Sequence, residues 1–197
     1  YTLSLHDALP ISEFLREGLA VQDTLSPDRL VFGVRTEWAE QQLRASFEPV
    51  ISAGTPVIVT DFATAELVKV AANSFLATKI SFINAMAEVC EVTGADVTQL
   101  AEAIGHDARI GRRFLSAGLG FGGGCLPKDI RAFIARAEEL GVDQAVSFLH
   151  EVDAFNRRRR ERTVDLGLEL VEGSCEGKRV AVLGAALPAA GLSNAAT

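Results

Sequence analysis

A helix-favouring segment at residues 64–92, TAELVKVAANSFLATKISFINAMAEVCEV, constrains the fold of this chain more than any other stretch. It is rich in alanine and in residues that let helices approach closely. Thr64 can cap its start and Gly94 can end it. Globular helices average about 10–14 residues, so the segment predicts one unusually long helix. A helix of that length usually spans a whole domain or an interface.

Two short apolar segments before this helix indicate a parallel sheet. LVFGV (30–34) and PVIVT (56–60) are predicted strands. Between them, TEWAEQQLRASFEPV (36–50) is a predicted helix with Thr36 as its N-cap. Strand, helix and strand in this order form a piece of a parallel α/β sheet that is too short to be a domain by itself.

More helices are predicted after the long one, each with a residue type at its ends that starts or stops helices. One helix is expected over 96–104, with Asp96 and Gln99 at capping-box spacing and Gly105 as its stop. Two more are expected, from Pro127 to Gly141 and from Asp143 to Glu172. GKRVAVLGA (177–185) is then a predicted strand that runs into glycine, as at the first strand of a Rossmann-like domain.

These segments predict a mixed α/β chain that is mostly helical. The first twelve residues, YTLSLHDALPIS, show no helical or strand period that continues into the rest and resemble a translated sequencing adapter, so we expect them to be a foreign, non-native segment. An ordinary frayed terminus is the alternative. The expected division is 1–12 as this foreign segment, 13–61 as the C-terminal part of one α/β domain, 62–173 as a helical domain, and 174–197 as the truncated start of a second α/β domain.

Charge and cysteine content exclude several functional classes. The net charge of -7 and the pI of about 5.0 argue against nucleic acid as the main partner, and RRRRER (157–162) is interpreted as a solvated helix face. Cys90, Cys125 and Cys175 are too sparse for a disulfide scaffold and fit a reducing cytosol, so a cytoplasmic protein is expected. No stretch reaches the roughly 18 apolar residues of a membrane span.

The loop GLGFGGGCLPKD (118–129) is costly to order because glycine loses the most backbone freedom on folding. Gly118, Gly120 and Gly123 match the G-x-G-x-x-G spacing, but no strand precedes them, so a dinucleotide-binding turn is not favoured here. A P-loop would need Gly-Lys-Ser/Thr. Zinc ligands would come in closely spaced pairs, whereas the cysteines and histidines are scattered, so no metal is expected.

Cys125 is the candidate nucleophile of this loop. Pro127 suits the first turn of a helix, and the positive end of a helix favours thiolate over thiol. Lys128 adds positive charge, and Asp129 follows one helical turn after the cysteine. A small core cysteine is the equally weighted alternative.

Lys69 and Asn73 form a second polar pair, because residues four apart share one helical face. They lie in the apolar stretch ELVKVAANSFLA, where a buried lysine is costly unless it has a partner or a task. A lysine at the rim with only its stem buried is the alternative.

Four stretches together resemble the UDP-glucose 6-dehydrogenase family of nucleotide-sugar dehydrogenases. They are EFLREGLAVQDTLSPDRLVFG (13–33), AELVKVAANSFLATKISFINAMAEVCEVTGADV (65–97), GHDARIGRRFLSAGLGFGGGCLPKD (105–129) and GKRVAVLGA (177–185). The resemblance implies an N-terminal Rossmann domain that binds NAD, a helical central domain whose long helix forms a homodimer, and a C-terminal Rossmann-like domain for the UDP part. This chain is then expected to hold the tail of the first, all of the second and the first strand of the third.

The resemblance also implies a reaction, in which two NAD take two hydrides from C6 of UDP-glucose to give UDP-glucuronate. Cys125 matches the nucleophile that traps the aldehyde. Lys69, with Asn73 beside it, matches the lysine that stabilises the oxyanion, and Asp129 and Glu13 match acids that handle protons and water. The implied substrate contacts are Phe14, Leu15, Arg109 across the dimer, Phe114, Ser116, Gly120, Phe121 and Gly122, and the implied cofactor contacts are Glu17 and Lys128.

Two positions depart from the family pattern. Ile11-Ser12 precedes Glu13 where the family has Asn-Pro, and Leu187-Pro188 stands where the family has Phe-Lys-Pro. Oxidation of GDP-mannose or UDP-N-acetylmannosamine is the alternative within the family. A non-enzymatic helical dimerisation module is the alternative from another class, since we expect the 197 residues to be inactive by themselves.

Overall fold

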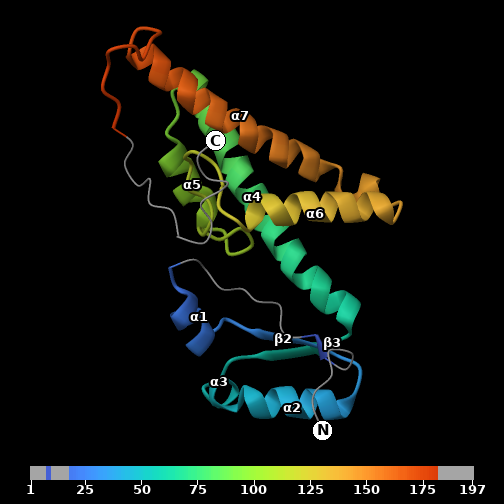
Figure 1. The fold of residues 1–197 in the computed structure, drawn as a ribbon. Coiled ribbons are helices and arrows are strands. Elements are labelled where there is room, and N and C mark those ends of the chain that lie inside the picture. Colours follow the sequence, from blue (N-terminus) through green and yellow to red (C-terminus); the bar gives the residue numbers. More distant parts are fainter. Residues whose placement is uncertain (1–7, 10–17, 182–197) are drawn as a thin grey trace. The chain divides into compact units, whose positions relative to one another are not determined.

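The computed structural model describes residues 8–9 and 18–181. The chain divides into two compact units, Tyr1–Ala72 and Asn73–Thr197, and the long helix α4 (Phe62–Thr93) contributes to both (Figure 1). Within the described residues all strands belong to the first unit, and the second is helical. The prediction of a mixed α/β chain that is mostly helical is therefore confirmed.

The first unit contains a small sheet in which β2 (Leu30–Val34) and β3 (Val57–Thr60) run parallel, with Phe32 opposite Val59. Both predicted strands and their parallel pairing are confirmed. A two-residue strand, β1 (Ala8–Leu9), runs antiparallel along the other edge of β2. This pairing does not test the foreign origin expected for the first twelve residues, because the open edge of a strand offers backbone groups that a segment of almost any sequence can pair with.

Helices α2 (Glu37–Ser46) and α3 (Glu48–Ser52) cover one face of this sheet, and α1 (Ala20–Leu25) precedes it (Figure 1). Their apolar side chains close a core against the strands. The buried members are Leu30, Phe32, Ala39 and Leu43, and the partly buried ones are Val34, Phe47, Val50, Ile51 and Val57.

The helix predicted over residues 36–50 is two helices in the structure. Its start is as predicted, because Thr36 Oγ1 accepts a hydrogen bond from the Ala39 N–H at 3.2 Å. The break falls at Phe47, between α2 and α3. Pro49 has no N–H to continue the helical ladder, so it occupies the first turn of a new helix instead.

Helix α4 is the predicted long helix and extends beyond both expected ends. Its cap is Asp61 rather than Thr64. The Asp61 carboxylate accepts hydrogen bonds from the Thr64 N–H at 2.7 Å and from its hydroxyl at 3.0 Å, and these bonds hold the pKa of Asp61 below its usual value. Aspartate is among the best N-caps, so the cap moves three residues earlier. Gly94 follows the helix with φ +75°, as expected for a stop.

The second unit packs α5 (Val97–Gly105), α6 (Leu126–Glu139) and α7 (Phe148–Leu170) around the later part of α4. One core cluster joins α4, α6 and α7 through Ala77, Phe121, Ile130, Ile134, Leu149 and Val152. A second joins α4, α5 and the segment after α5 through Ile83, Ala101 and Leu115. No helix in the described part of the chain is long and apolar enough to span a membrane.

The predicted ends of α5 and α6 are mostly confirmed. Asp96 caps α5 by accepting from the Gln99 N–H at 3.2 Å, and Pro127 lies in the first turn of α6. Gly105 was expected to stop α5 but is its last helical residue. A Cβ there would lie 2.8 Å from Arg112 Cδ. Glycine is therefore needed at this position because Arg112 packs closely against it, and not because the chain turns there.

Two other predictions need correction. The helix expected from Asp143 begins as a separate 3-10 turn, η1 (Asp143–Val146), before α7. The strand expected at 177–185 is absent through residue 181, since a strand needs a partner and this segment has none among the described residues. Positions 182–185 of that strand lie outside the described residues.

Candidate active site at the start of helix α6

Cys125 immediately precedes α6, and its free thiol is exposed. The Asp129 N–H donates to the Cys125 carbonyl at 2.9 Å, so the first helical turn closes directly on the cysteine. The Cys125 side chain makes no capping hydrogen bond, and Pro127 lies in the same turn. The alternative of a core cysteine fails here, although it describes the buried Cys90.

Asp129 is buried and charge-paired one turn along α6. Asn73 Nδ2 of α4 donates to Asp129 Oδ2 at 2.7 Å, and Lys128 Nζ lies 2.5 Å from Asp129 Oδ1. The bond to Asp129, with its negative charge, raises the pKa of Lys128 above its usual value. The second unit therefore brings together four of the predicted residues, Cys125, Lys128, Asp129 and Asn73.

Lys69 lies on α4 one turn before Asn73 and belongs to the first unit. It is partly buried, as a lysine with a covered stem would be. Glu13, Phe14, Leu15 and Glu17 lie outside the described residues.

Arg109 lies on a surface turn, with its side chain 89% exposed. Its guanidinium donates to the Asp107 carboxylate at 2.6 Å, which raises the pKa of Arg109 and lowers that of Asp107. Phe114 adopts φ +65° and is exposed, whereas the next residue, Leu115, is buried in the core. Ser116 is also exposed.

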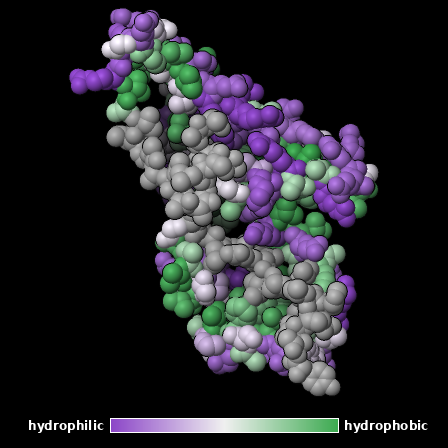
Figure 2. All heavy atoms as spheres, in the orientation of Figure 1, coloured by the Kyte–Doolittle hydropathy of each residue, from purple (hydrophilic) through white to green (hydrophobic). Residues whose placement is uncertain are grey.

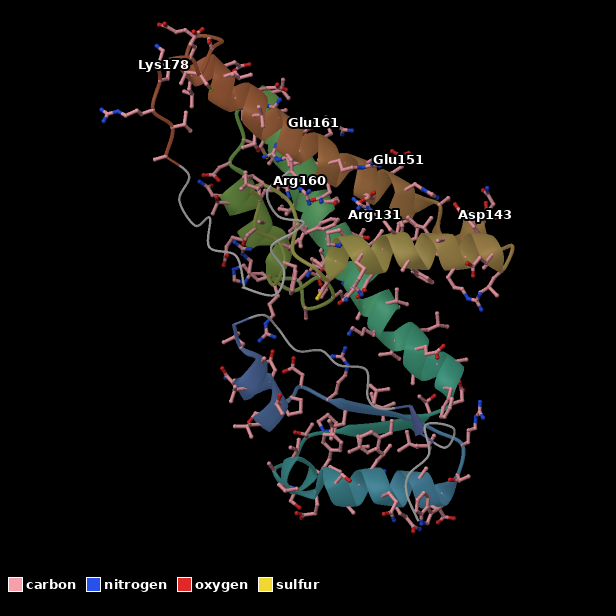
Figure 3. All side chains as sticks on the ribbon, viewed as in Figure 1. Arg131, Asp143, Glu151, Arg160, Glu161 and Lys178 are labelled. Atoms are coloured by element: carbon pink, nitrogen blue, oxygen red, sulfur yellow. The ribbon has the colours of Figure 1, made fainter. Side chains whose placement is uncertain are left out.

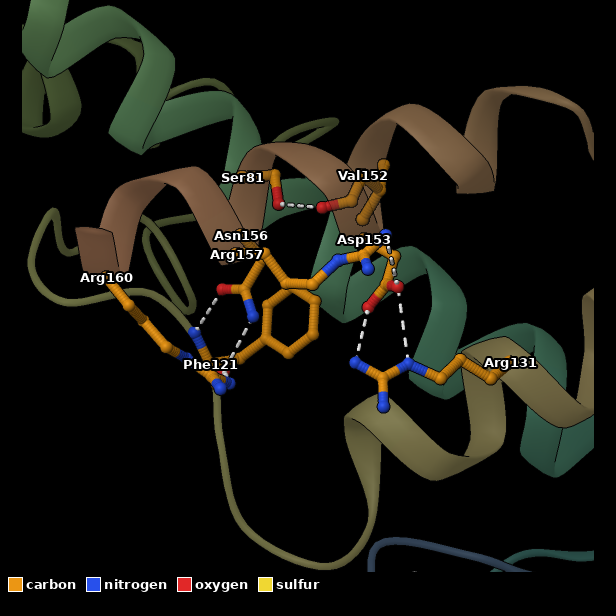
Figure 4. Close-up of polar contacts among 8 residues, drawn as sticks. All are labelled: Ser81, Phe121, Arg131, Val152, Asp153, Asn156, Arg157 and Arg160. Carbon is orange, nitrogen blue, oxygen red and sulfur yellow. Dashed lines mark hydrogen bonds and ion pairs between the residues drawn. The ribbon is translucent and has the colours of Figure 1, made fainter. Parts of the chain in front are cut away.

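Two buried asparagines hold the glycine loop. Asn84 Oδ1 of α4 accepts from the Gly118 N–H at 2.8 Å. The Asn156 amide of α7 bonds both the N–H and the carbonyl of Phe121, each at 2.8 Å (Figure 4). Phe121 is buried as part of the helical core, whereas Gly122 is exposed.

Part of the arginine-rich run on α7 also serves this loop. Arg159 Nε donates to the Gly118 carbonyl at 3.1 Å, and Arg160, which extends from α7 in Figure 3, donates to the Phe121 carbonyl at 2.8 Å. Arg157 and Arg158 are exposed. Figure 2 shows a largely hydrophilic surface along α7. The interpretation as a solvated face therefore holds for part of the run only.

Sequence reasoning missed the two asparagines. The available signal was an amide side chain inside a predicted helix, because such a group needs partners when it is buried. Their partners are loop residues 34 or 35 positions away in the sequence, and spacing along one helix gives no indication of them.

This arrangement offers an accessible thiol at a helix start, beside a buried carboxylate and an amide. A thiol can act as a nucleophile and a carboxylate can move protons, so the set suits covalent chemistry at a carbonyl carbon. No group of three or more His, Cys, Asp or Glu side chains in the described ranges could hold a metal ion.

Comparisons with known proteins show which family this chain is similar to. Residues 63–158 match the family model of the UDP-glucose/GDP-mannose dehydrogenase family, central domain. The UDP-glucose 6-dehydrogenase of Rickettsia felis is 48% identical over 172 residues, covering 87% of this chain and 38% of that protein. The UDP-glucose 6-dehydrogenase of Bacillus subtilis is 43% identical over 180 residues, covering 91% of this chain and 38% of that protein.

A solved structure is also similar to this chain. The UDP-glucose dehydrogenase from Pyrobaculum islandicum matches with a TM-score of 0.70 and 41% identity, over 82% of this chain and 35% of that one. The chain thus spans about two fifths of the length of the curated relatives it matches. From the matched central domain and these relatives, the chain belongs to the UDP-glucose/GDP-mannose dehydrogenase family.

Proposed function

We propose that the whole protein oxidises C6 of UDP-glucose to a carboxylate, with NAD as the oxidant and a covalent intermediate on Cys125. The observation that carries this proposal is the exposed Cys125 thiol at the start of α6, one turn from the buried and charge-paired Asp129. Similarity to proteins named UDP-glucose 6-dehydrogenase supports the choice of substrate.

Lys128 is the described residue that suits the cofactor. Its side chain is 71% exposed, and its raised pKa keeps the ammonium positive at neutral pH. An accessible ammonium fits the diphosphate of a dinucleotide. When bound, NAD supplies the acceptor for the hydrides that leave C6.

Side chains of this protein carry out the remaining steps. Once C6 is an aldehyde, Cys125 Sγ forms a bond to it and gives a thiohemiacetal. The family resemblance assigns Lys69 to the oxygen of this adduct, and Asn73 retains a second amide N–H for it beyond the one given to Asp129. The second oxidation leaves a thioester. Water then attacks C6 while Asp129 takes one of its protons, and the C–S bond breaks so that Cys125 is again a thiolate. The carboxylic acid formed loses its proton to solvent and leaves as the carboxylate.

A substrate panel tests this function against its sister activities. We expect the whole enzyme to form two NADH per UDP-glucose, with UDP-glucuronate as the product, and to act at least about tenfold more slowly on GDP-mannose and UDP-N-acetylmannosamine, since a misfitting sugar leaves polar groups of the site unpaired. Faster turnover of either sister substrate would reassign the enzyme. Failure with all three would favour the non-enzymatic alternative.

We also propose a homodimer through α4. Phe75, Phe82 and Val89 are 66%, 49% and 50% exposed and recur every seven residues, so they form one apolar stripe. A stripe of large apolar side chains on a single helix face is the kind of surface that a second copy of the same helix buries.

Replacing Phe82 with glutamate is expected to dissociate this dimer, because it puts a charge at the centre of the apolar stripe. Analytical ultracentrifugation should give a monomer for Phe82→Glu. The control, Val164→Glu, makes the same kind of change at an exposed apolar position of α7, 63% exposed, and should remain dimeric. A monomeric unmutated protein, or a dimeric Phe82→Glu variant, contradicts the proposal.

A further inference from the structure

The geometry points to Asn156 as a positioning residue of the active site: its buried amide fixes the backbone of the glycine loop ahead of Cys125 (Figure 4). The inference rests on the proposed function and goes beyond it. Asn156 lies on α7, outside the four stretches that carry the family resemblance.

One side chain satisfies both polar groups of Phe121. Asn156 Oδ1 accepts from the Phe121 N–H, and Asn156 Nδ2 donates to the Phe121 carbonyl, each at 2.8 Å. Arg160 adds a second donor to that carbonyl at 2.8 Å. Asn156 is only 2% exposed, so its loss would leave the buried Phe121 N–H without its acceptor and the carbonyl with Arg160 as its donor.

The backbone of Gly120 closes directly against the same amide. Its φ of +96° is a conformation that favours glycine, and a Cβ at this position would lie 2.2 Å from Asn156 Oδ1. Residue 120 therefore has two separate reasons to be glycine, and one of them is Asn156.

Phe121 is the last residue before Cys125 whose backbone is held by these side chains. Asn84 and Arg159 hold the loop upstream at Gly118. After Phe121, residues 122–124 are exposed glycines that lead straight to Cys125. Phe121 therefore sets where this glycine segment begins, four residues before the thiol, and small misplacements at reacting groups are costly in rate.

Kinetics of the whole enzyme test the inference. Asn156→Ala is expected to lower kcat/KM for UDP-glucose by about 10²-fold. Asn156→Asp keeps the acceptor for the Phe121 N–H but loses the donor, and should fall between Asn156→Ala and the unmutated enzyme. The matched control is Leu43→Ala, a buried residue of α2 in the separate core of the first unit, which should lower the melting temperature and leave kcat/KM within about threefold when assayed well below that temperature.

Hydrogen exchange gives a second measurement that does not depend on catalysis. The Phe121 amide should exchange faster in Asn156→Ala than in Leu43→Ala, whereas amides of α2 should be faster in Leu43→Ala. Equal kcat/KM in the two variants, or an unchanged Phe121 amide in Asn156→Ala, overturns the inference. An unmutated enzyme that fails to oxidise UDP-glucose overturns the proposed function instead, and the exchange comparison still decides whether Asn156 holds the loop.

Discussion

Replacing Cys125 with alanine is expected to lower the rate of UDP-glucuronate formation by about 10³-fold or more, because no thioester can form without the sulfur. Any remaining oxidation should stop at the aldehyde, with one NADH per UDP-glucose instead of two. Absorbance at 340 nm together with chromatographic analysis of the nucleotide sugars measures both quantities.

Cys175 provides the matched control for this experiment. Its thiol is also free and exposed, but it lies after α7 and away from the start of any described helix. Cys175→Ala should therefore turn over at the unmutated rate. UDP-glucuronate formation at the unmutated rate in the Cys125→Ala enzyme would mean that the covalent mechanism is wrong.

Replacing Asp129 with asparagine is expected to lower kcat by about 10²- to 10⁴-fold, since an amide cannot accept the proton of the hydrolytic water. The fold should persist, because asparagine has nearly the same shape and its oxygen can still accept from Asn73 Nδ2. Steady-state kinetics beside a thermal melt separate the two effects.

Asp153 allows the same substitution at a second buried, charge-paired carboxylate. It lies on α7 and pairs with Arg131 at 3.2 Å and with Arg157 at 3.4 Å (Figure 4). Asp153→Asn should cost about 1–3 kcal/mol of stability and leave kcat close to the unmutated value. Equal losses of kcat in the Asp129 and Asp153 variants would make Asp129 a structural residue only.

Local signals predicted most of the elements in this chain. Apolar runs gave β2 and β3, and Thr36, Asp96 and Pro127 marked the starts of helices, because each acts within its own turn. The errors arose where two local signals competed. Asp61 displaced Thr64 as the cap of α4, and Pro49 split one expected helix into two.

Local sequence signals could not predict the residues that hold the glycine loop. Cys125 and Asp129 are four residues apart, so helical geometry alone places them in one turn. Asn84 and Asn156 reach the loop from two different helices. No spacing rule relates them to Gly118 or Phe121, and their role follows only from the packing of α4 and α7 around the loop.

The proposed reaction depends on a covalent bond between Cys125 and C6 of the nucleotide sugar. Acid quenching of the whole enzyme during turnover of UDP-glucose, followed by peptide mass spectrometry, tests it most directly. A glucuronyl thioester is expected on the peptide that contains Cys125 and on neither Cys90 nor Cys175. Steady production of UDP-glucuronate with Cys125 unmodified at every quench time would contradict the account.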